Sequence, residues 1–119
     1  MDRHSTGRRG EYLAEQFLLE QGYRIVTRNF RLGRHGEIDL IAYDGAALVF
    51  IEVKYRRTTT YGTPEDAITA GKRRQLRRIA EGFLAITALE AREYRFDVIA
   101  IEEGADGSIA IRHWRNAFW

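Results

Sequence analysis

Two strand-like segments that carry acidic side chains constrain the fold of this chain more than any other feature. Residues 36–54 read GEIDLIAYDGAALVFIEVK, with Glu37 and Asp39 in the first apolar run and Glu52 in the second. Burying a carboxylate without a partner costs several kcal/mol. The fold must therefore place these groups at solvated strand ends or provide them with a common counter-charge.

Strand geometry predicts which of these side chains lie near one another. Successive strand residues point to opposite faces, so Glu37 and Asp39 share one face, and Glu52 and Lys54 share a face of the next strand. If residues 44–47 close a hairpin, Asp39 lies opposite Glu52 and Glu37 lies opposite Lys54. Directly opposed side chains have Cβ atoms roughly 4.5–5.5 Å apart.

Two carboxylates at that distance repel each other, and a divalent cation bound by both removes the conflict. Oxygen ligands without histidine or cysteine indicate Mg²⁺ or Mn²⁺ rather than zinc. Lys54, two residues after Glu52 on the same face, would reach the attacking water or a phosphate. The alternative is a set of solvated strand-end residues in which Glu37 and Lys54 form an ordinary ion pair.

The order of elements along the chain predicts an α/β fold with a mixed sheet. Helical periodicity and turn residues alternate with runs rich in β-branched and aromatic residues, in the order αβββαββ. A helix between the third and fourth strands allows those strands to lie parallel. We expect helices at residues 5–21, capped by Ser5 or Thr6, and at residues 65–86, begun by Pro64 and kinked near Gly71, with strands at residues 23–30, 37–43, 48–54, 94–101 and 109–114.

Length and composition indicate one domain over residues 1–119. The absence of cysteine excludes disulfides and cysteine-ligated zinc. The longest apolar run, AALVFI, is far too short to span a membrane, and the first residues lack the apolar core of a secretory signal. We therefore expect a cytoplasmic protein without a membrane partner.

Charge is distributed unevenly along the chain. Residues 37–51 carry three acidic and no basic side chains, whereas residues 52–78 carry eight basic and three acidic ones. Basic segments beside a small acidic centre suit a polyanion bound next to a metal, and ordinary solvated surface is the alternative.

Several motifs resemble one known family over nearly the whole chain. GRRGEYLAEQFLLEQGY, RNFR, GEIDLIA, VFIEVKYR and RFDVIAI are similar to the YraN-like family of small bacterial proteins, within the PD-(D/E)xK nuclease superfamily. This resemblance implies a restriction-endonuclease-like αβββαβ core, with a further C-terminal strand here. It also implies kinship with archaeal Holliday-junction resolvases, which are dimeric, magnesium-dependent nucleases. The superfamily's proline is absent, since Ile38 precedes Asp39.

The same resemblance implies roles for individual residues. Asp39 and Glu52 would bind the metal together with the backbone carbonyl of Val53, and Lys54 would position or activate the attacking water. Glu11 matches the family's early glutamate and would complete the metal shell. The alternative is that Glu11 is an acidic residue near a helix N-terminus that interacts favourably with the helix dipole.

Glu37 is expected just outside the metal shell, oriented by Lys54, or else as that lysine's structural partner. A basic turn in the second helix and two arginines after the third strand are candidates for binding nucleic-acid phosphates, with a solvated helix face as the alternative. These residues are Arg56, Arg57, Lys72, Arg73, Arg74, Gln75, Arg77 and Arg78.

Other polar and aromatic residues are assigned to structure. Asp97 is expected to be structural, and the three histidines, His4, His35 and His113, show no ligand spacing and are expected at the surface. The aromatic residues at the C-terminus, Trp114, Phe118 and Trp119, are expected to pack in the core rather than form a dimer contact.

These features and the family resemblance together predict a magnesium-dependent or manganese-dependent endonuclease that hydrolyses phosphodiester bonds of DNA, including branched or otherwise structured DNA. Kinship with the resolvases adds a homodimer as a candidate assembly. The alternative from another class is a nucleic-acid-binding module that retains the nuclease fold without cleavage. A nuclease acting on RNA is a third reading, since nothing in the sequence reads a 2′-hydroxyl group.

Overall fold

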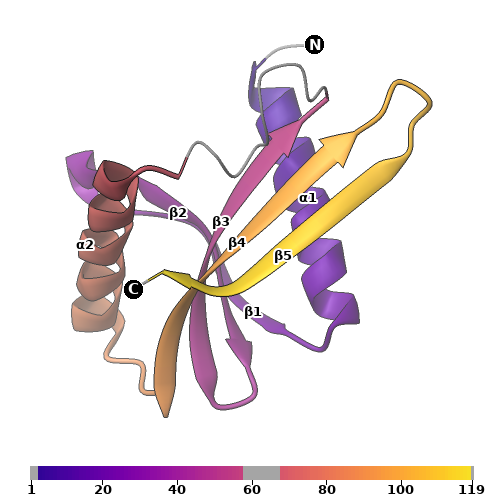
Figure 1. Ribbon diagram of the computed structural model, residues 1–119. Helices are drawn as coiled ribbons and strands as arrows, with labels where there is room; N and C mark the ends of the chain where they lie inside the picture. The colour runs from indigo at the N-terminus through magenta and orange to yellow at the C-terminus, as the bar shows by residue number, and fades with distance from the viewer. Residues whose placement is uncertain (1–2, 58–67, 119) are drawn as a thin grey trace.

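The computed structural model describes the backbone of residues 3–57 and 68–118, and the side chains of residues 8–57 and 68–118. Two long helices and five strands follow one another in the predicted αβββαββ order, with one short 3-10 helix added (Figure 1). The elements are α1 (Arg3–Glu20), β1 (Arg24–Arg31), η1 (Gly33–His35), β2 (Glu37–Asp44), β3 (Ala47–Arg56), α2 (Ala70–Thr87), β4 (Glu93–Glu103) and β5 (Ile109–Phe118).

The five strands form a single mixed sheet in the order β1-β2-β3-β4-β5. The central pair, β3 and β4, is parallel, and the other three pairs are antiparallel. A parallel pair requires a crossover connection, and α2 lies within that connection. The predicted α/β class is therefore confirmed, and the arrangement is consistent with a restriction-endonuclease-like core.

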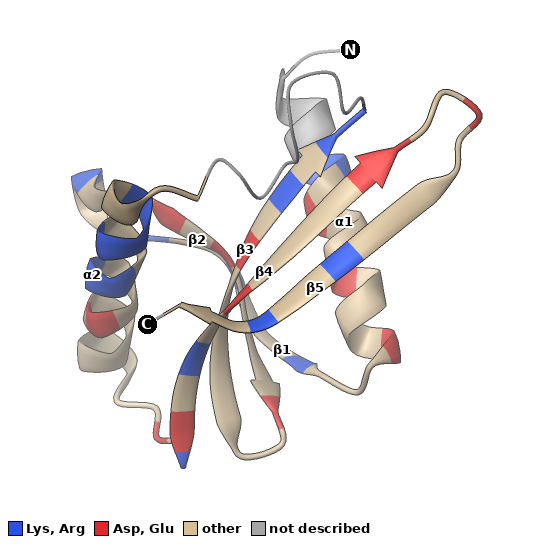
Figure 2. Ribbon diagram, viewed as in Figure 1, with Lys and Arg blue, Asp and Glu red and all other residues tan. Residues whose placement is uncertain are grey.

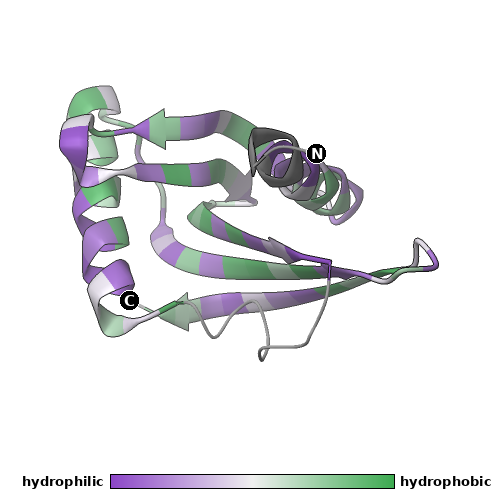
Figure 3. Ribbon diagram, turned by 90° about the horizontal axis from the view of Figure 1, so that it is seen from above, coloured by the Kyte–Doolittle hydropathy of each residue, from purple (hydrophilic) through white to green (hydrophobic). Residues whose placement is uncertain are grey.

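The sheet separates two apolar layers because alternate residues of its central strands point to opposite faces. Figure 3 shows hydrophobic stretches along the strands and on both helices. On β3, Leu48 and Phe50 pack in the cluster that includes Ile79 of α2, whereas Val49 and Ile51 pack in the cluster that includes Leu18 of α1. Neither helix, within the part of the chain that the structure describes, is long and apolar enough to cross a bilayer.

The register of the β2–β3 hairpin is as predicted, with Tyr43 opposite Leu48. Its described ladder ends at the pair Leu40 and Ile51, short of the acidic residues. Beyond that pair, β2 continues alongside β1 as far as Glu37, while β3 continues alongside β4. The two strands therefore part, and we call the region between their separated ends, residues 37–39 and 52–54, the strand fork.

The second helix begins later than predicted. Thr69 is the N-cap residue in an extended conformation, and its side-chain oxygen accepts a hydrogen bond of 3.2 Å from the backbone N–H of Lys72. A capping hydroxyl satisfies an otherwise unpaired donor of the first turn, so the helix starts at Ala70 and Gly71 lies in its first turn rather than at a kink. Pro64 and the side chains of Ser5 and Thr6 lie outside the described residues.

Candidate functional site at the strand fork

In the strand fork, where the backbone ladder between β2 and β3 has ended, the side chain of Asp39 bonds to β3 instead. Its Oδ2 accepts a hydrogen bond of 2.8 Å from the backbone N–H of Val53, the residue between Glu52 and Lys54. In a strand, the N–H and C=O of one residue face the same neighbour, so the carbonyl of Val53 also faces the fork. A carbonyl in this position is available as an oxygen ligand.

Three acidic side chains from two different elements converge beside the fork. Carboxylate oxygens of Glu11, Glu37 and Asp39 lie within 4.8 Å of one another. Glu11 comes from α1, whereas Glu37 and Asp39 come from β2. The packing of α1 therefore brings Glu11 close to the two carboxylates that strand alternation places on one face. Figure 2 shows the acidic bands of β2 and β3 near the point where the basic end of α2 approaches the sheet.

Glycine precedes two of these acidic residues and permits a close approach in both cases. A Cβ atom on Gly10 would lie 2.5 Å from the Cβ of Tyr55, so only glycine lets α1 approach β3 this closely. Gly36 has φ of +109° and faces the side chain of Gln75, which donates a hydrogen bond to the carbonyl of His35. Both contacts help to set where Glu11 and Glu37 enter the site.

Asn29 links the two outer carboxylates, and the sequence analysis assigned it no role. Its Nδ2 donates to Glu11 Oε1 at 2.9 Å and to Glu37 Oε1 at 3.4 Å. The residue has φ of +51°, in the left-handed region that asparagine tolerates better than most residues. The RNFR motif was the available signal, because an asparagine inside a strand pattern is unusual.

Glu52 lies in the fork with two lysines rather than with one. Its Oε1 is 3.5 Å from Lys54 Nζ and 4.0 Å from Lys72 Nζ at the start of α2. The predicted pairing of Glu37 with Lys54 is wrong, since Glu37 Oε2 instead lies 3.5 Å from an Arg31 nitrogen. The reason is geometric: the strands separate before that pair of positions can meet.

Without a bound cation, the surroundings of Asp39 and Glu52 favour the protonated forms of these two carboxyl groups. Burial raises the pKa of Asp39 to about 8, with the charge of nearby Glu52 as the second cause, although the N–H of Val53 opposes both. Burial also raises the pKa of Glu52, while Lys72 and Lys54 hold it down in part. Two neighbouring carboxyls with raised pKa values are typical of functional sites.

The side chains at the fork fit a hard divalent cation. The donor set is made of carboxylate oxygens and a backbone carbonyl, which Mg²⁺ and Mn²⁺ prefer. Glu52 Oε2 is buried without a hydrogen-bond partner among the described residues. A buried, unpaired carboxylate oxygen beside other carboxylates is stabilised when a cation binds there. The three most closely grouped acids include Glu37, which was expected outside the metal shell, and not Glu52.

The predicted phosphate-binding residues do not all have the same surroundings. Lys72 reaches the fork through its ion pair with Glu52, and Gln75 donates a hydrogen bond to the carbonyl of His35 in η1. The guanidinium of Arg73 lies 5.9 Å from the centre of the Phe118 ring. Arg57 donates to the hydroxyl of Tyr55 at 3.4 Å, near the end of β3. Arg74 and Arg78 are exposed on α2, Arg77 is half-buried there, and Arg56 is half-buried at the end of β3.

The remaining polar and aromatic predictions have mixed outcomes. Asp97 is fully buried and structural, as predicted, but His113 is not a surface residue, because its Nε2 lies 2.7 Å from Asp97 Oδ2. Phe118 packs in the core as predicted, stacked on Phe96 at 4.7 Å between ring centres. Trp114 is 49% exposed, so its predicted core packing is wrong. His35 is exposed, while Trp119 and the side chain of His4 lie outside the described residues.

The five-stranded mixed sheet and its acidic fork define an α/β protein consistent with the restriction-endonuclease-like class. Residues 10–101 match the model of the uncharacterised protein family UPF0102. The chain belongs to this family, which confirms the YraN-like resemblance of its motifs.

Curated relatives match nearly the full chain. A UPF0102 protein of Symbiobacterium thermophilum is 52% identical over 113 residues, covering 95% of each chain. Similar proteins of Chlorobium chlorochromatii and Rhodococcus opacus are 45% and 46% identical, covering 95% and 96% of this chain and 90% and 96% of their own. These relatives carry the family name alone, so they establish kinship without naming an activity.

Proposed function

We propose that this protein is a metal-dependent endonuclease that hydrolyses phosphodiester bonds of DNA, including branched or otherwise structured DNA. One observation carries the proposal: Asp39 and Glu52 share the strand fork, where burial, and for Asp39 the charge of Glu52 as well, raises their pKa values at a cost to folding. Carboxyl groups with such energetically unfavourable surroundings are concentrated at functional sites, where the shifted pKa is part of the chemistry. Glu11 and Glu37 add further acidic oxygens at the same place.

Each residue of the fork has a role in this proposal. Asp39 and Glu52 would hold Mg²⁺ or Mn²⁺ together with Glu11 and the carbonyl of Val53. When bound, the ion would polarise the phosphate and lower the pKa of the attacking water. Lys54, whose ammonium is partly exposed beside Glu52, would orient that water or neutralise charge that develops on the phosphate.

The first turns of α2 would bind the nucleic-acid backbone. Lys72 and Arg73 lie at the helix N-terminus, where the macrodipole also attracts anions. Lys72 is within ion-pair distance of Glu52, so a phosphate bound there would lie beside the fork. Arg56 and Arg57, which follow the fork along β3, would extend the contact to neighbouring phosphates.

A non-catalytic nucleic-acid-binding module is the second candidate, and one observation favours it. Lys54 and Lys72 both neutralise Glu52, so the fork already contains part of the positive charge that a cation would supply. In this case the basic residues would still bind phosphates, but the ion and the cleavage step would be lost.

A cleavage panel tests the proposal directly. Single-stranded, duplex, flapped and four-way DNA, and an RNA of matching sequence, are incubated with Mg²⁺ or Mn²⁺ and resolved on denaturing gels. We expect metal-dependent cutting of at least one DNA substrate, and calorimetry should show manganese binding that Asp39→Ala and Glu52→Ala abolish. Glu93→Ala is the matched control, because this exposed glutamate pairs with Ala47 at the end of β3 that lies away from the fork. Nucleic-acid binding without any cutting or manganese binding would favour the binding module.

A further inference from the structure

An exposed tryptophan shares a row of the sheet with Glu52. The register pairs Glu52 with Val98 across β3 and β4, and pairs Val98 with Trp114 across β4 and β5. Directly paired residues lie on the same face, and Val98 packs in the cluster on the α2 side. Adjacent strands are about 4.8 Å apart, so the Trp114 backbone lies on the order of 10 Å from that of Glu52.

Helix α2 covers only part of this face. Its apolar residues pack over Phe50, Phe96 and Phe118, which form the neighbouring row, whereas Trp114 remains 49% exposed. Tryptophan is highly buried on average, because exposing an indole leaves a large apolar surface in water. This half-exposed indole therefore presents apolar ring surface to solvent beside the candidate active site.

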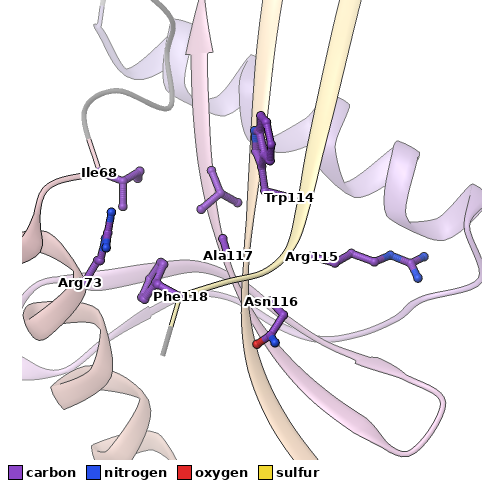
Figure 4. Close-up of a pocket in the computed structure, with 8 residues that line it drawn as sticks. Ile68, Arg73, Trp114, Arg115, Asn116, Ala117 and Phe118 are labelled. Carbon is purple, nitrogen blue, oxygen red and sulfur yellow. The ribbon is translucent and has the colours of Figure 1, made fainter.

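A groove of about 360 Å³ lies between this tryptophan and the beginning of α2. Ile68 and Arg73 lie next to each other on one side of the groove, and Trp114 and Phe118 of β5 lie across from them (Figure 4). Val98 also lines the groove. The Arg73 guanidinium lies over the Phe118 ring, 5.9 Å from its centre, while the side chain of Arg115 points away from the groove. The groove thus combines flat apolar walls with one positive charge.

We propose that this groove binds one unpaired nucleotide of the nucleic-acid substrate, with its base stacked on Trp114 and its phosphate near Arg73. The inference rests on the proposed function and specifies its substrate class: DNA with an unpaired nucleotide close to the phosphate that is cut. Bases stack on exposed aromatic side chains without regard to sequence, and an arginine adds attraction for the phosphate. A base inside an intact duplex is already stacked on its neighbours and does not enter such a groove.

Equilibrium binding without divalent ions separates this subsite from the chemistry of the fork. Anisotropy of labelled DNA is measured for a blunt duplex, the same duplex with a short single-stranded flap, and a single-stranded oligonucleotide. We expect Trp114→Ala to weaken binding of the flapped and single-stranded DNA about tenfold, with the blunt duplex unchanged. Trp114→Phe should retain most of the affinity because it keeps an aromatic face.

Ile109→Ala is the matched control, because Ile109 is also a partly exposed apolar residue of β5 but lies outside the groove. It should leave binding of all three ligands unchanged. A second measurement avoids the risk that Trp114→Ala disturbs the fold. In a Trp119→Phe background, fluorescence of Trp114 should be quenched by flapped DNA and not by the blunt duplex. Equal binding by Trp114→Ala and wild type, or no selective quenching, would overturn the subsite.

The outcomes distinguish this inference from the proposed function. A protein that never cuts DNA, but binds flapped DNA in a Trp114-dependent way, retains the subsite and loses the nuclease proposal. A protein that cuts flapped DNA equally well with Trp114→Ala remains a nuclease and loses the subsite. A dimer that dissociates in Trp114→Ala, with DNA binding unchanged, would overturn the proposal and assign the groove to a second copy of the chain.

Discussion

Asp97 is fully buried and Asp39 is half-buried, and their surroundings shift their pKa values in opposite directions. Asp97 accepts hydrogen bonds from Arg95 Nε at 3.0 Å, His113 Nε2 at 2.7 Å and the backbone N–H of Asn116 at 3.0 Å. Burial alone would raise the pKa of Asp97, but these donors lower it. Asp39 accepts one bond from Val53, and its pKa is raised to about 8.

The difference separates a structural carboxylate from a candidate functional one. Asp97 ties β4 to β5, and Arg95 connects it to Asp44 on β2 at 2.9 Å. Every partner of Asp97 is a donor, so its charge contributes to folding. Asp39 instead faces Glu11, Glu37 and Glu52, so its negative charge opposes folding. The chemistry of their neighbours is what distinguishes these two carboxylates.

The largest expected effect is on stability, and it tests the structural half of the comparison. Asp97→Ala leaves Arg95 and His113 without their buried partner, so we expect a loss of about 3–5 kcal/mol in the free energy of unfolding. Asp39→Ala should cost less than about 1 kcal/mol, because the lost bond to Val53 is offset by relief of repulsion. Urea denaturation in metal-free buffer measures both. An equally large loss for Asp39→Ala would break the comparison.

The next effect is on cleavage. Lys54→Met retains most of the side-chain bulk and removes its charge, so we expect the fold and DNA binding to persist while cutting slows roughly a hundredfold. Lys72→Met is the matched control, because it also removes an ammonium beside Glu52 but lies on α2. We expect Lys72→Met to raise KM for DNA more than it lowers kcat. Normal cutting by Lys54→Met would remove this residue from the mechanism, and unfolding would make it a structural partner of Glu52.

The smallest effect is the pH dependence of stability in metal-free protein. The pKa of Asp39 rises from about 3.8 to about 8 on folding, so its contribution is fully present below pH 4 and is lost as pH rises toward 8. We expect stability to fall across this range, and Asp39→Asn or added Mn²⁺ should make the fall smaller. The pKa of Asp97 is lowered on folding, so its contribution to stability should be lost as pH falls below about 4. Thermal melts from pH 3 to 9 measure both, and a profile unchanged by Asp39→Asn would contradict the first.

Sequence patterns predicted most of the fold and part of the site because these features depend on short stretches of chain. Strand alternation and the turn length correctly placed Tyr43 opposite Leu48. The pairing of Glu37 with Lys54 failed because that register does not continue into the fork, where Asp39 takes the N–H of Val53. The start of α2 was misplaced because Thr69 caps the helix, and helical periodicity alone does not show which residue is the cap.

The sequence by itself determined the order of elements, the acidic residues on β2 and β3, and the family to which the chain belongs. Only the tertiary structure decided that Glu11 and Asn29 reach the fork, that His113 is a partner of Asp97, and that Trp114 lies in one row with Glu52. Periodicity is a local property of the backbone, whereas these contacts join residues that are distant in the chain. They depend on where strands separate, on strand register, and on how closely a glycine lets one element approach another.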